Sequence, residues 1–141
     1  MTEVILVALR DELPVAVPAG VEVIFTGVGK VHAAIAAAGA LARGATSIIN
    51  YGSAGAVDAQ LTGLITVGAA VERDMDLRPL GLELGQSVGA QMDERQPVVL
   101  RWGEGPTIGT GDSFAAEVPE LTCDLVDMEA FAIAKACAQV G

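Results

Sequence analysis

The sequence predicts an α/β domain, a three-layer αβα sandwich built around a central mixed, mostly parallel sheet. Its 141 residues are 52% hydrophobic but only 4% aromatic, and 17 are glycine. Such a composition predicts a core of Ala, Val, Leu and Ile between closely approaching backbones. The first strands are continuous apolar runs, as is typical of parallel strands covered on both faces. One domain spanning residues 1–141 is expected, since typical domains hold about 100 to 150 residues.

The first half of the chain predicts the order strand, strand, helix, strand. Val4–Leu9 and Val21–Phe25 are short apolar runs of the kind that form buried strands. Val31–Arg43 is rich in alanine, a strong helix former, and Gly44 stands just past its end, where a left-handed cap is expected. Ser47–Tyr51 is expected to be the next strand.

The second half predicts shorter strands and a closing helix. Leu64–Val71 combines apolar and small residues as a strand does, whereas Asp74–Gly85 has no period and predicts a loop over a functional face. Met128–Val140 has the apolar spacing of a helix. Further strands are expected at Val98–Arg101, Thr107–Thr110 and Leu121–Val126.

Composition and charge exclude several classes of protein. The mean hydropathy of +0.51 is incompatible with intrinsic disorder, and no uncharged apolar stretch reaches the roughly 18 to 20 residues of a membrane helix. Eight Lys and Arg against 18 Asp and Glu disfavour nucleic acid as a partner. The start of the chain, Met1-Thr2-Glu3, lacks the basic region of a secretory signal, so a cytoplasmic location is expected. Cys123 and Cys137 lack CxxC spacing and are expected to be reduced thiols.

Several common catalytic motifs are absent. The single histidine, His32, lies in the helical run, which argues against Ser-His-Asp and Cys-His catalysis and favours a packed or surface histidine. Gly27–Lys30 looks like a phosphate loop, but Val31 stands where a P-loop needs Ser or Thr. Neither Gly52–Gly55 nor Gly109–Gly111 completes the GxGxxG fingerprint of dinucleotide binding.

Carboxylates and small-residue loops follow the predicted strands. Open α/β sheets bind their ligands beyond the carboxyl ends of the strands. Each acid taken singly could solvate a turn or favour a helix N-terminus. Their joint placement indicates a ligand site, formed by Asp11–Glu12, Gly52–Gly55, Gly111–Phe114 and Asp127 with Glu129.

Four motifs in this order carry a resemblance to a known family. They are Thr26–Val31, Asn50–Gly55, Thr110–Phe114 and Val126–Ala130, and the similarity runs from Val4 to Val140. The sequence resembles the nucleoside phosphorylase and nucleosidase superfamily, in particular its branch of 5'-methylthioadenosine/S-adenosylhomocysteine nucleosidases. The fold that this resemblance implies is the nucleoside phosphorylase-like α/β sandwich.

The resemblance implies cleavage of an N-glycosidic bond through an oxocarbenium-like ribosyl transition state, with no cofactor and no metal. Glu129 would bind the ribose hydroxyls and stabilise positive charge on the sugar. Glu12 would activate the attacking water with the help of Ser53, and Phe114 would stack on the purine. The substrate-binding residues implied are Ala8, Ala54, Gly55, Ser113, Phe114, Asp127 and Met128.

The choice between hydrolase and phosphorylase depends on the anion-binding positions. Phosphorylases of the superfamily carry an arginine where this chain has Asn50, and Asp11 and Glu12 would repel a phosphate dianion. Arg10 beside them could nevertheless serve an anion. We expect water to be the nucleophile; a phosphate-dependent phosphorylase and a catalytically silent nucleoside-binding module are the alternatives. Leu80 stands where the family usually has an aromatic residue, so ordinary purine nucleosides and futalosine-like substrates stay open beside methylthioadenosine.

The sequence departs from the family after its closing helix. Family members continue into a strand ending in a Ser-Asp pair, whose aspartate is taken as the general acid, and then a helix, whereas this sequence stops at Gly141. Slow or absent turnover by the 141-residue form is therefore expected, with Asp112 as the better substitute acid. The resemblance also implies a homodimer, with the segment Asp74–Leu84 as part of the contact.

Overall fold

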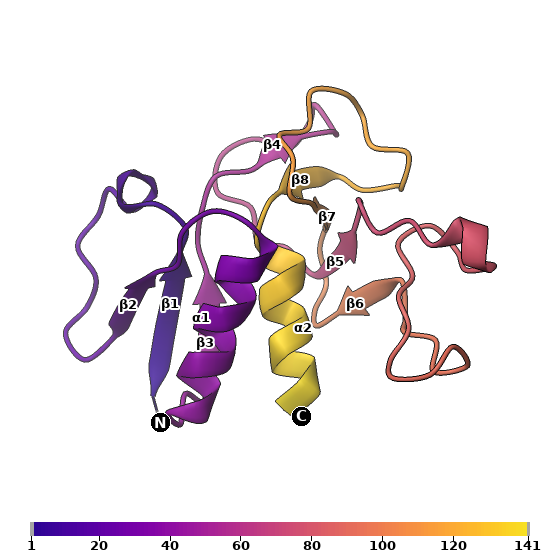
Figure 1. Cartoon of the computed structure of the whole chain (residues 1–141). Helices are drawn as coiled ribbons and strands as arrows, with labels where there is room; N and C mark the ends of the chain where they lie inside the picture. Colours follow the sequence, from indigo (N-terminus) through magenta and orange to yellow (C-terminus); the bar gives the residue numbers. More distant parts are fainter. Residues whose placement is uncertain (1, 141) are drawn as a thin grey trace.

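Two β-sheets and two α-helices make up the fold (Figure 1), seen in a computed structural model that describes residues 2–140. The first sheet has the order β2-β1-β3, and its strands are β1 (Glu3–Val7), β2 (Glu22–Phe25) and β3 (Ser47–Asn50). The second has the order β4-β8-β7-β5-β6, and its strands are β4 (Gly55–Ala56), β5 (Ala69–Glu72), β6 (Val99–Arg101), β7 (Thr107–Thr110) and β8 (Leu125–Asp127).

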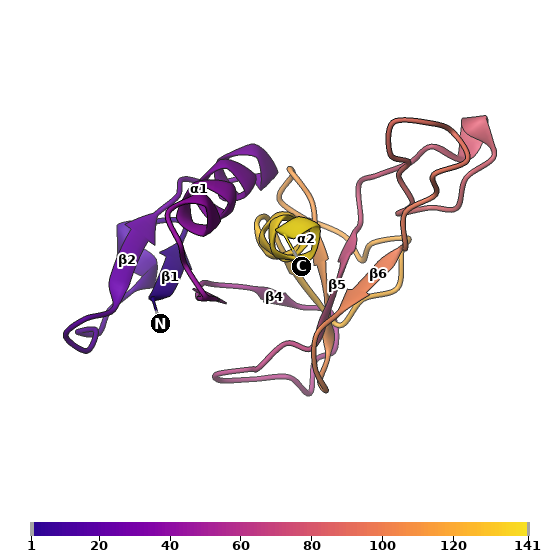
Figure 2. The same ribbon diagram turned by 90° about the horizontal axis from the view of Figure 1, so that it is seen from below.

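The helices are α1 (Lys30–Ala42) and α2 (Ala130–Val140), which lie side by side. Figure 2 shows α1 over the first sheet and α2 between α1 and the second sheet. Short 3-10 helices follow β1 (η1, Arg10–Glu12) and β5 (η2, Arg78–Leu80). None of the helices in the described part of the chain has the length and apolar character needed to cross a membrane.

Parallel pairing dominates, as the apolar runs predict. Four of the six strand pairings are parallel, and the antiparallel strands β4 and β6 lie at the two edges of the second sheet. In the second sheet the register aligns Glu72 with Thr110, and Thr110 with Asp127. Three polar side chains therefore stand in one row at the carboxyl edge of the sheet.

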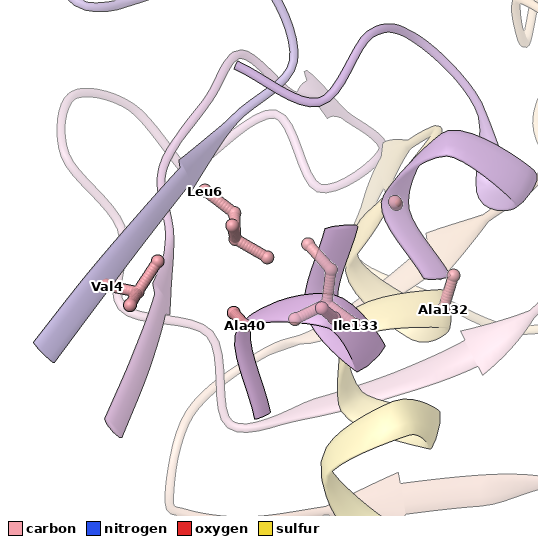
Figure 3. Packing of buried hydrophobic residues seen from close by; sticks show 7 residues of the cluster. Val4, Leu6, Ala40, Ala132 and Ile133 are labelled. Atoms are coloured by element: carbon pink, nitrogen blue, oxygen red, sulfur yellow. The ribbon is translucent and has the colours of Figure 1, made fainter. Parts of the chain in front are cut away.

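The core between the helices and the first sheet consists of small and branched aliphatic residues (Figure 3). Leu6 and Ala37 are fully buried, and Ile133 of α2 packs into the same cluster. Alanine side chains let α1 and α2 approach closely, which larger residues would prevent. The remaining buried members of this cluster are Val4, Ala33, Ala40 and Ala132.

The α/β class and the predicted helices are confirmed, with boundaries shifted by one or two residues. Gly44 has a φ of +98° and donates its N–H to the Leu41 carbonyl oxygen at 3.0 Å, as expected of a residue that ends α1. The strands of residues 2–140 form two sheets, where the sequence predicts a single central one.

Some predicted strands are shorter than expected. The strand predicted over Leu64–Val71 begins only at Ala69, and Leu64 is 86% exposed. A close backbone crossing lies directly before β5, since a Cβ on Gly68 would lie 2.6 Å from the carbonyl group of Glu104. Likewise, β8 begins at Leu125 rather than Leu121, and the two-residue strand β4 was not predicted.

Candidate active site

The loops after β1 and β3 meet through the carboxylate of Glu12. Its Oε2 accepts the backbone N–H of Ser53 at 2.7 Å, and its Oε1 accepts the N–H of Leu9 at 3.1 Å. Gly52 leaves room for this contact, since a Cβ there would lie 3.1 Å from Glu12 Oε2. The structure therefore brings together two of the three residues to which the resemblance assigns catalysis.

Glu129, at the start of α2, reaches across to the first half of the chain. Its Oε2 accepts the backbone N–H of Gly29 at 2.9 Å. Gly29 has a φ of +104°, a conformation that side-chain-bearing residues rarely adopt, and this conformation directs its N–H toward the carboxylate. Glu129 is half-buried, and burial raises the pKa of its carboxyl group; the negative charges of Asp127 and Glu12 raise the pKa further, while the Gly29 hydrogen bond opposes the rise.

Asp127 joins the end of β8 to the start of α2. Its Oδ2 accepts the N–H groups of Glu129 at 3.1 Å and of Ala130 at 2.7 Å, which is an N-terminal helix cap. Its Oδ1 accepts the hydroxyl of Thr110 at 2.5 Å, and Thr110 Oγ1 in turn accepts the N–H of Phe131 at 2.9 Å. Burial raises the pKa of Asp127 despite these hydrogen bonds. Asp127 thus positions the backbone that carries Glu129.

A cavity of about 1000 Å³ extends from these carboxylates between the two sheets. At one end Ser53, Asp127 and Glu129 line it, while apolar residues of β3, α2 and the loop before β5 line the rest. Ala54 also lines the cavity, and Gly55 packs against Val126, where a Cβ would lie 3.0 Å from the Val126 side chain. A space of this size is in the range of small-molecule sites.

The base loop, Gly111–Phe114, which the resemblance assigns to the purine base, lies beside Asp127 but does not close on the cavity. Phe114 is 91% exposed and contributes nothing to the lining of the cavity, whereas Ser113 is tied to Arg73. Ala8 is buried at the end of β1, and Met128 is half-buried between Asp127 and Glu129. The structure therefore assembles the residues that the resemblance assigns to the ribose more tightly than those that it assigns to the base.

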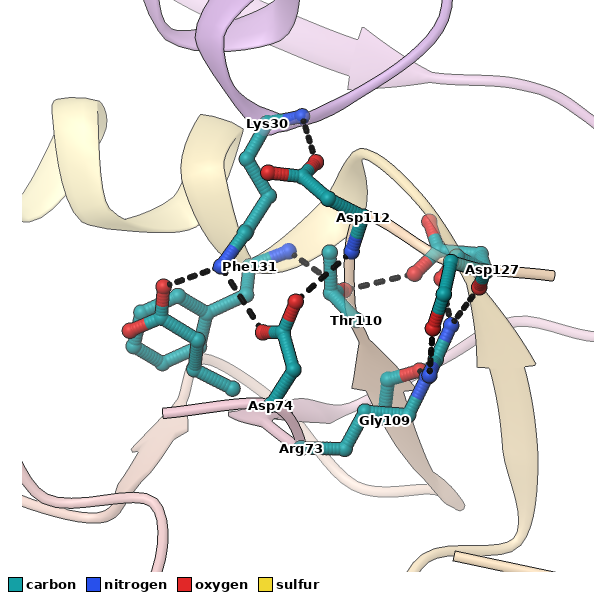
Figure 4. A network of polar contacts seen from close by, with 10 residues as sticks. Lys30, Arg73, Asp74, Gly109, Thr110, Asp112, Asp127 and Phe131 are labelled. Atoms are coloured by element: carbon teal, nitrogen blue, oxygen red, sulfur yellow. Dashed lines mark hydrogen bonds and ion pairs between the residues drawn. The ribbon is translucent and has the colours of Figure 1, made fainter. Parts of the chain in front are cut away.

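A polar network that the sequence did not reveal surrounds the base loop (Figure 4). Lys30 Nζ forms ion pairs with Glu72 at 2.8 Å and with Asp74 at 2.7 Å. Asp74 Oδ2 accepts the N–H of Asp112, and Asp112 Oδ1 accepts the N–H of Lys30, both at 2.8 Å. Lys30, Asp74 and Asp112 therefore form a closed triangle of hydrogen bonds. The only signal for it in the sequence is that Asp74 follows a predicted strand end.

Arg73 forms a second part of this network, on the far side of the base loop. Its guanidinium group donates to the carbonyl oxygens of Gly109, Ser113 and Asp127. His32, by contrast, is exposed, and its Nδ1 lies 2.9 Å from the Val28 carbonyl oxygen; the sequence predicts a packed or surface histidine.

Comparison with known proteins identifies the fold. No protein-family model matches the chain, and no curated protein sequence matches it. Among solved structures, S-adenosylhomocysteine nucleosidase from Streptococcus pyogenes, in complex with 5-methylthiotubericidin, is 26% identical with a TM-score of 0.77, over 100% of this chain and 79% of that one. The 5'-methylthioadenosine/S-adenosylhomocysteine nucleosidase of Helicobacter pylori with butyl-thio-DADMe-Immucillin-A is 22% identical with a TM-score of 0.79, over 100% and 81% of the two chains.

A third similar structure is native futalosine hydrolase of Helicobacter pylori strain 26695, 21% identical with a TM-score of 0.77 over 99% of this chain and 80% of that one. The chain therefore has the nucleosidase fold of the nucleoside phosphorylase and nucleosidase superfamily. More particularly, it is similar in structure to the 5'-methylthioadenosine/S-adenosylhomocysteine nucleosidases and to futalosine hydrolase.

Proposed function

We propose that this protein binds a purine nucleoside, of the 5'-methylthioadenosine kind, and hydrolyses its N-glycosidic bond. The observation that carries the proposal is that Ser53 and Glu129 line a large cavity in a nucleosidase fold, and that Glu12 binds the backbone N–H of Ser53 and acts through its charge on Glu129. Two of the similar structures contain nucleoside analogues as ligands, which supports a purine nucleoside as the ligand class.

Glu129 holds the ribose in the proposed reaction. A carboxylate accepts hydrogen bonds from both hydroxyls of a diol, and its charge stabilises the positive charge that grows on the sugar as the bond to the base breaks. Before substrate arrives, Gly29 holds the Glu129 carboxylate, and the Asp127 cap holds the backbone that carries it. Such preorganisation is what makes electrostatic stabilisation of a transition state effective.

Glu12 activates the attacking water, and Ser53 helps to hold it. The two hydrogen bonds from Leu9 and Ser53 fix the orientation of the Glu12 carboxylate. Glu12 is close enough to Glu129 for its charge to act on that group. In the proposed reaction, a water bound by Glu12 attacks the carbon that carries the developing charge. On the other side of the substrate, Phe114 offers a free ring on which the purine can stack.

Water is favoured over phosphate as the nucleophile. The carboxylates of Glu12, Glu129 and Asp127 lie close together and would repel a phosphate dianion. Arg10, the cation that could attract one, lies over the ring of Phe25 with its guanidinium carbon 4.4 Å from the ring centroid. Its cation–π contact occupies the face of the guanidinium group.

Release of free base from 5'-methylthioadenosine and adenosine, with and without phosphate, tests the proposal. We expect slow release that does not depend on phosphate and that is lost in Glu12→Gln. The matched control is Glu3→Gln, which changes an exposed glutamate at the start of β1. Phosphate-dependent release would show a phosphorylase instead, and binding of adenosine without any release would show a silent nucleoside-binding module.

We also propose that the protein is a homodimer. The outer face of α1 exposes Val31 and Ile35, at 68% and 67%, with Val28 just before the helix. An apolar stripe of this kind is typical of an interaction surface, and the Asp74–Leu84 segment stays our prediction for a further part of the contact. Sedimentation at micromolar concentration decides the matter, since a monomer of about 14.3 kDa contradicts the proposal.

A further inference from the structure

Arg73 directly follows β5, and its side chain ends among backbone carbonyl groups of the candidate site (Figure 4). Nε donates to Gly109 O at 3.1 Å, and Nη2 donates to Ser113 O at 2.5 Å and to Asp127 O at 3.3 Å. Nη1 lies 3.5 Å from Ser113 Oγ. One guanidinium group thus connects β7, the base loop (Gly111–Phe114) and the end of β8.

The glycines of this region make room for the Arg73 side chain. A Cβ on Gly111 would lie 2.8 Å from Arg73 Cζ and 3.1 Å from Asp74 Cγ. A Cβ on Gly109 would lie 3.4 Å from Arg73 Cδ and only 2.7 Å from Cys123 Sγ. The packing of Arg73 therefore explains why the Thr110–Phe114 motif has a glycine at position 111, because any larger residue would displace the guanidinium group.

We propose that Arg73 is a positioning residue for purine recognition, which rests on the proposed function. It holds the base loop against the end of β8, and so sets the distance between Phe114, on the base side, and Glu129, on the ribose side. The role requires a rigid planar fork whose several donors point in fixed directions, which arginine has and lysine lacks. Its Nε and Nη2 are used by protein carbonyl groups, so Arg73 acts through the loop and not as a ligand for an anionic substrate.

Apart from Arg73, the base loop is attached at its first two residues, and the N–H of Gly111 donates to the Asp127 carbonyl oxygen at 3.2 Å. Phe114 is 91% exposed and Val118 is 76% exposed, so few apolar contacts hold the segment. On the opposite side, the Lys30–Asp74–Asp112 triangle fixes only Asp112. Without Arg73 the stretch from Ser113 onward loses its main hydrogen bond to the sheet, and a segment with few contacts opens locally.

The variants that test this are Arg73→Gln and Arg73→Lys, with Arg43→Gln as the matched control. Arg43 pairs with Glu22 at 3.5 Å, both side chains about half exposed, and it stands at the end of α1 away from the base loop. Amide hydrogen exchange followed by mass spectrometry reports local order without any ligand. We expect the amides of Gly111 and Asp112, which donate to Asp127 O and Asp74 Oδ2, to exchange roughly tenfold faster or more in both Arg73 variants, with unchanged exchange in β1 and β3.

Ligand binding gives the second readout. Calorimetry with adenine alone should show roughly tenfold weaker binding in both Arg73 variants and no change in Arg43→Gln. In a turnover assay KM should rise more than kcat falls. Gly111→Ala, which keeps Arg73 but displaces its guanidinium group, should reproduce both effects.

Unchanged exchange of Gly111 and Asp112 in Arg73→Gln would overturn the inference, and so would an equal rise in exchange across β1 and β3. Full retention of adenine affinity in both Arg73 variants would overturn it as well. If the unmodified chain binds no adenine, the proposed function fails by itself, and the exchange experiment still decides whether Arg73 orders the base loop.

Discussion

Replacing Glu129 by glutamine should weaken ligand binding without weakening the fold. The Glu129 carboxylate is half-buried, and the charges of Asp127, Glu12 and Asp112 repel it. Only the Gly29 hydrogen bond, at 2.9 Å, stabilises its ionised form. The amide oxygen of glutamine can accept the same N–H, so the substitution removes the repelled charge and keeps the contact.

The sign of the effect on stability follows from the raised pKa of Glu129. When the pKa of a carboxyl group is higher in the folded than in the unfolded state, its full contribution to stability is present at pH values below the pKa of the unfolded state, here 4.5. That contribution is lost as the pH rises through the folded pKa. At pH 7 the ionised Glu129 is therefore unfavourable to folding, and we expect the free energy of unfolding of Glu129→Gln to equal or exceed that of the unmodified chain.

Binding should change in the opposite direction. Charge-assisted hydrogen bonds contribute about 1.5 to 3 kcal/mol, which corresponds to roughly a tenfold to hundredfold change in affinity. Calorimetry with an adenosine analogue measures this loss, and urea denaturation at pH 7 measures the stability. Glu3→Gln is the control for removal of an exposed charge. Unchanged affinity in Glu129→Gln would remove Glu129 from the site, and a lower free energy of unfolding would refute the electrostatic argument.

Three further substitutions test the polar framework. Lys30→Met should lower the free energy of unfolding by about 1 to 3 kcal/mol at pH 7. Burial alone would raise the pKa of Asp74, but hydrogen bonds from Lys30 and Asp112 lower it. The free energy of unfolding of the unmodified chain should therefore fall on acidification below the ordinary Asp74 pKa of 3.8. In Lys30→Met it should fall less. Asp127→Ala should cost about 1 to 3 kcal/mol in urea denaturation, since α2 loses its cap; an unchanged midpoint would contradict this. Thr110→Val, at a fully buried site, should lower the free energy of unfolding by about 2 to 3 kcal/mol, because it leaves the Phe131 N–H unpaired. Thermal unfolding measures the loss. The control is Thr62→Val, which changes an exposed threonine.

Local patterns in the sequence were sufficient to predict most elements of the fold. The apolar runs at β1, β2 and β3 and the alanine-rich α1 depend on composition and period, which are local properties. The division into two sheets, the short strand β4 and the close crossing at Gly68 depend on contacts between distant segments. No pattern within a few residues of Gly68 records that Glu104 will lie against it.

The candidate site shows the same limit. Acids after strand ends could be predicted because parallel strands place their carboxyl ends at one edge, and the structure does bring Glu12 beside Ser53. The partners of those acids could not be predicted. Gly29 and Glu129 are 100 positions apart, and Lys30 and Asp74 are 44 apart. Such pairs follow from the packing of α1 against α2 and of α2 against β5, which no single segment specifies.

The placement of Lys30 and Arg73 explains how the site can keep a negative electrostatic potential. Lys30 is held by Glu72 and Asp74, and the Nε and Nη2 donors of Arg73 go to carbonyl oxygens, so neither cation pairs with Glu12 or Glu129. The latter two carboxylates are instead held by neutral backbone N–H groups. Their charge therefore stays available to a ligand. For the proposed reaction this field has the right sign, since it favours a sugar that becomes positive in the transition state and opposes the approach of phosphate.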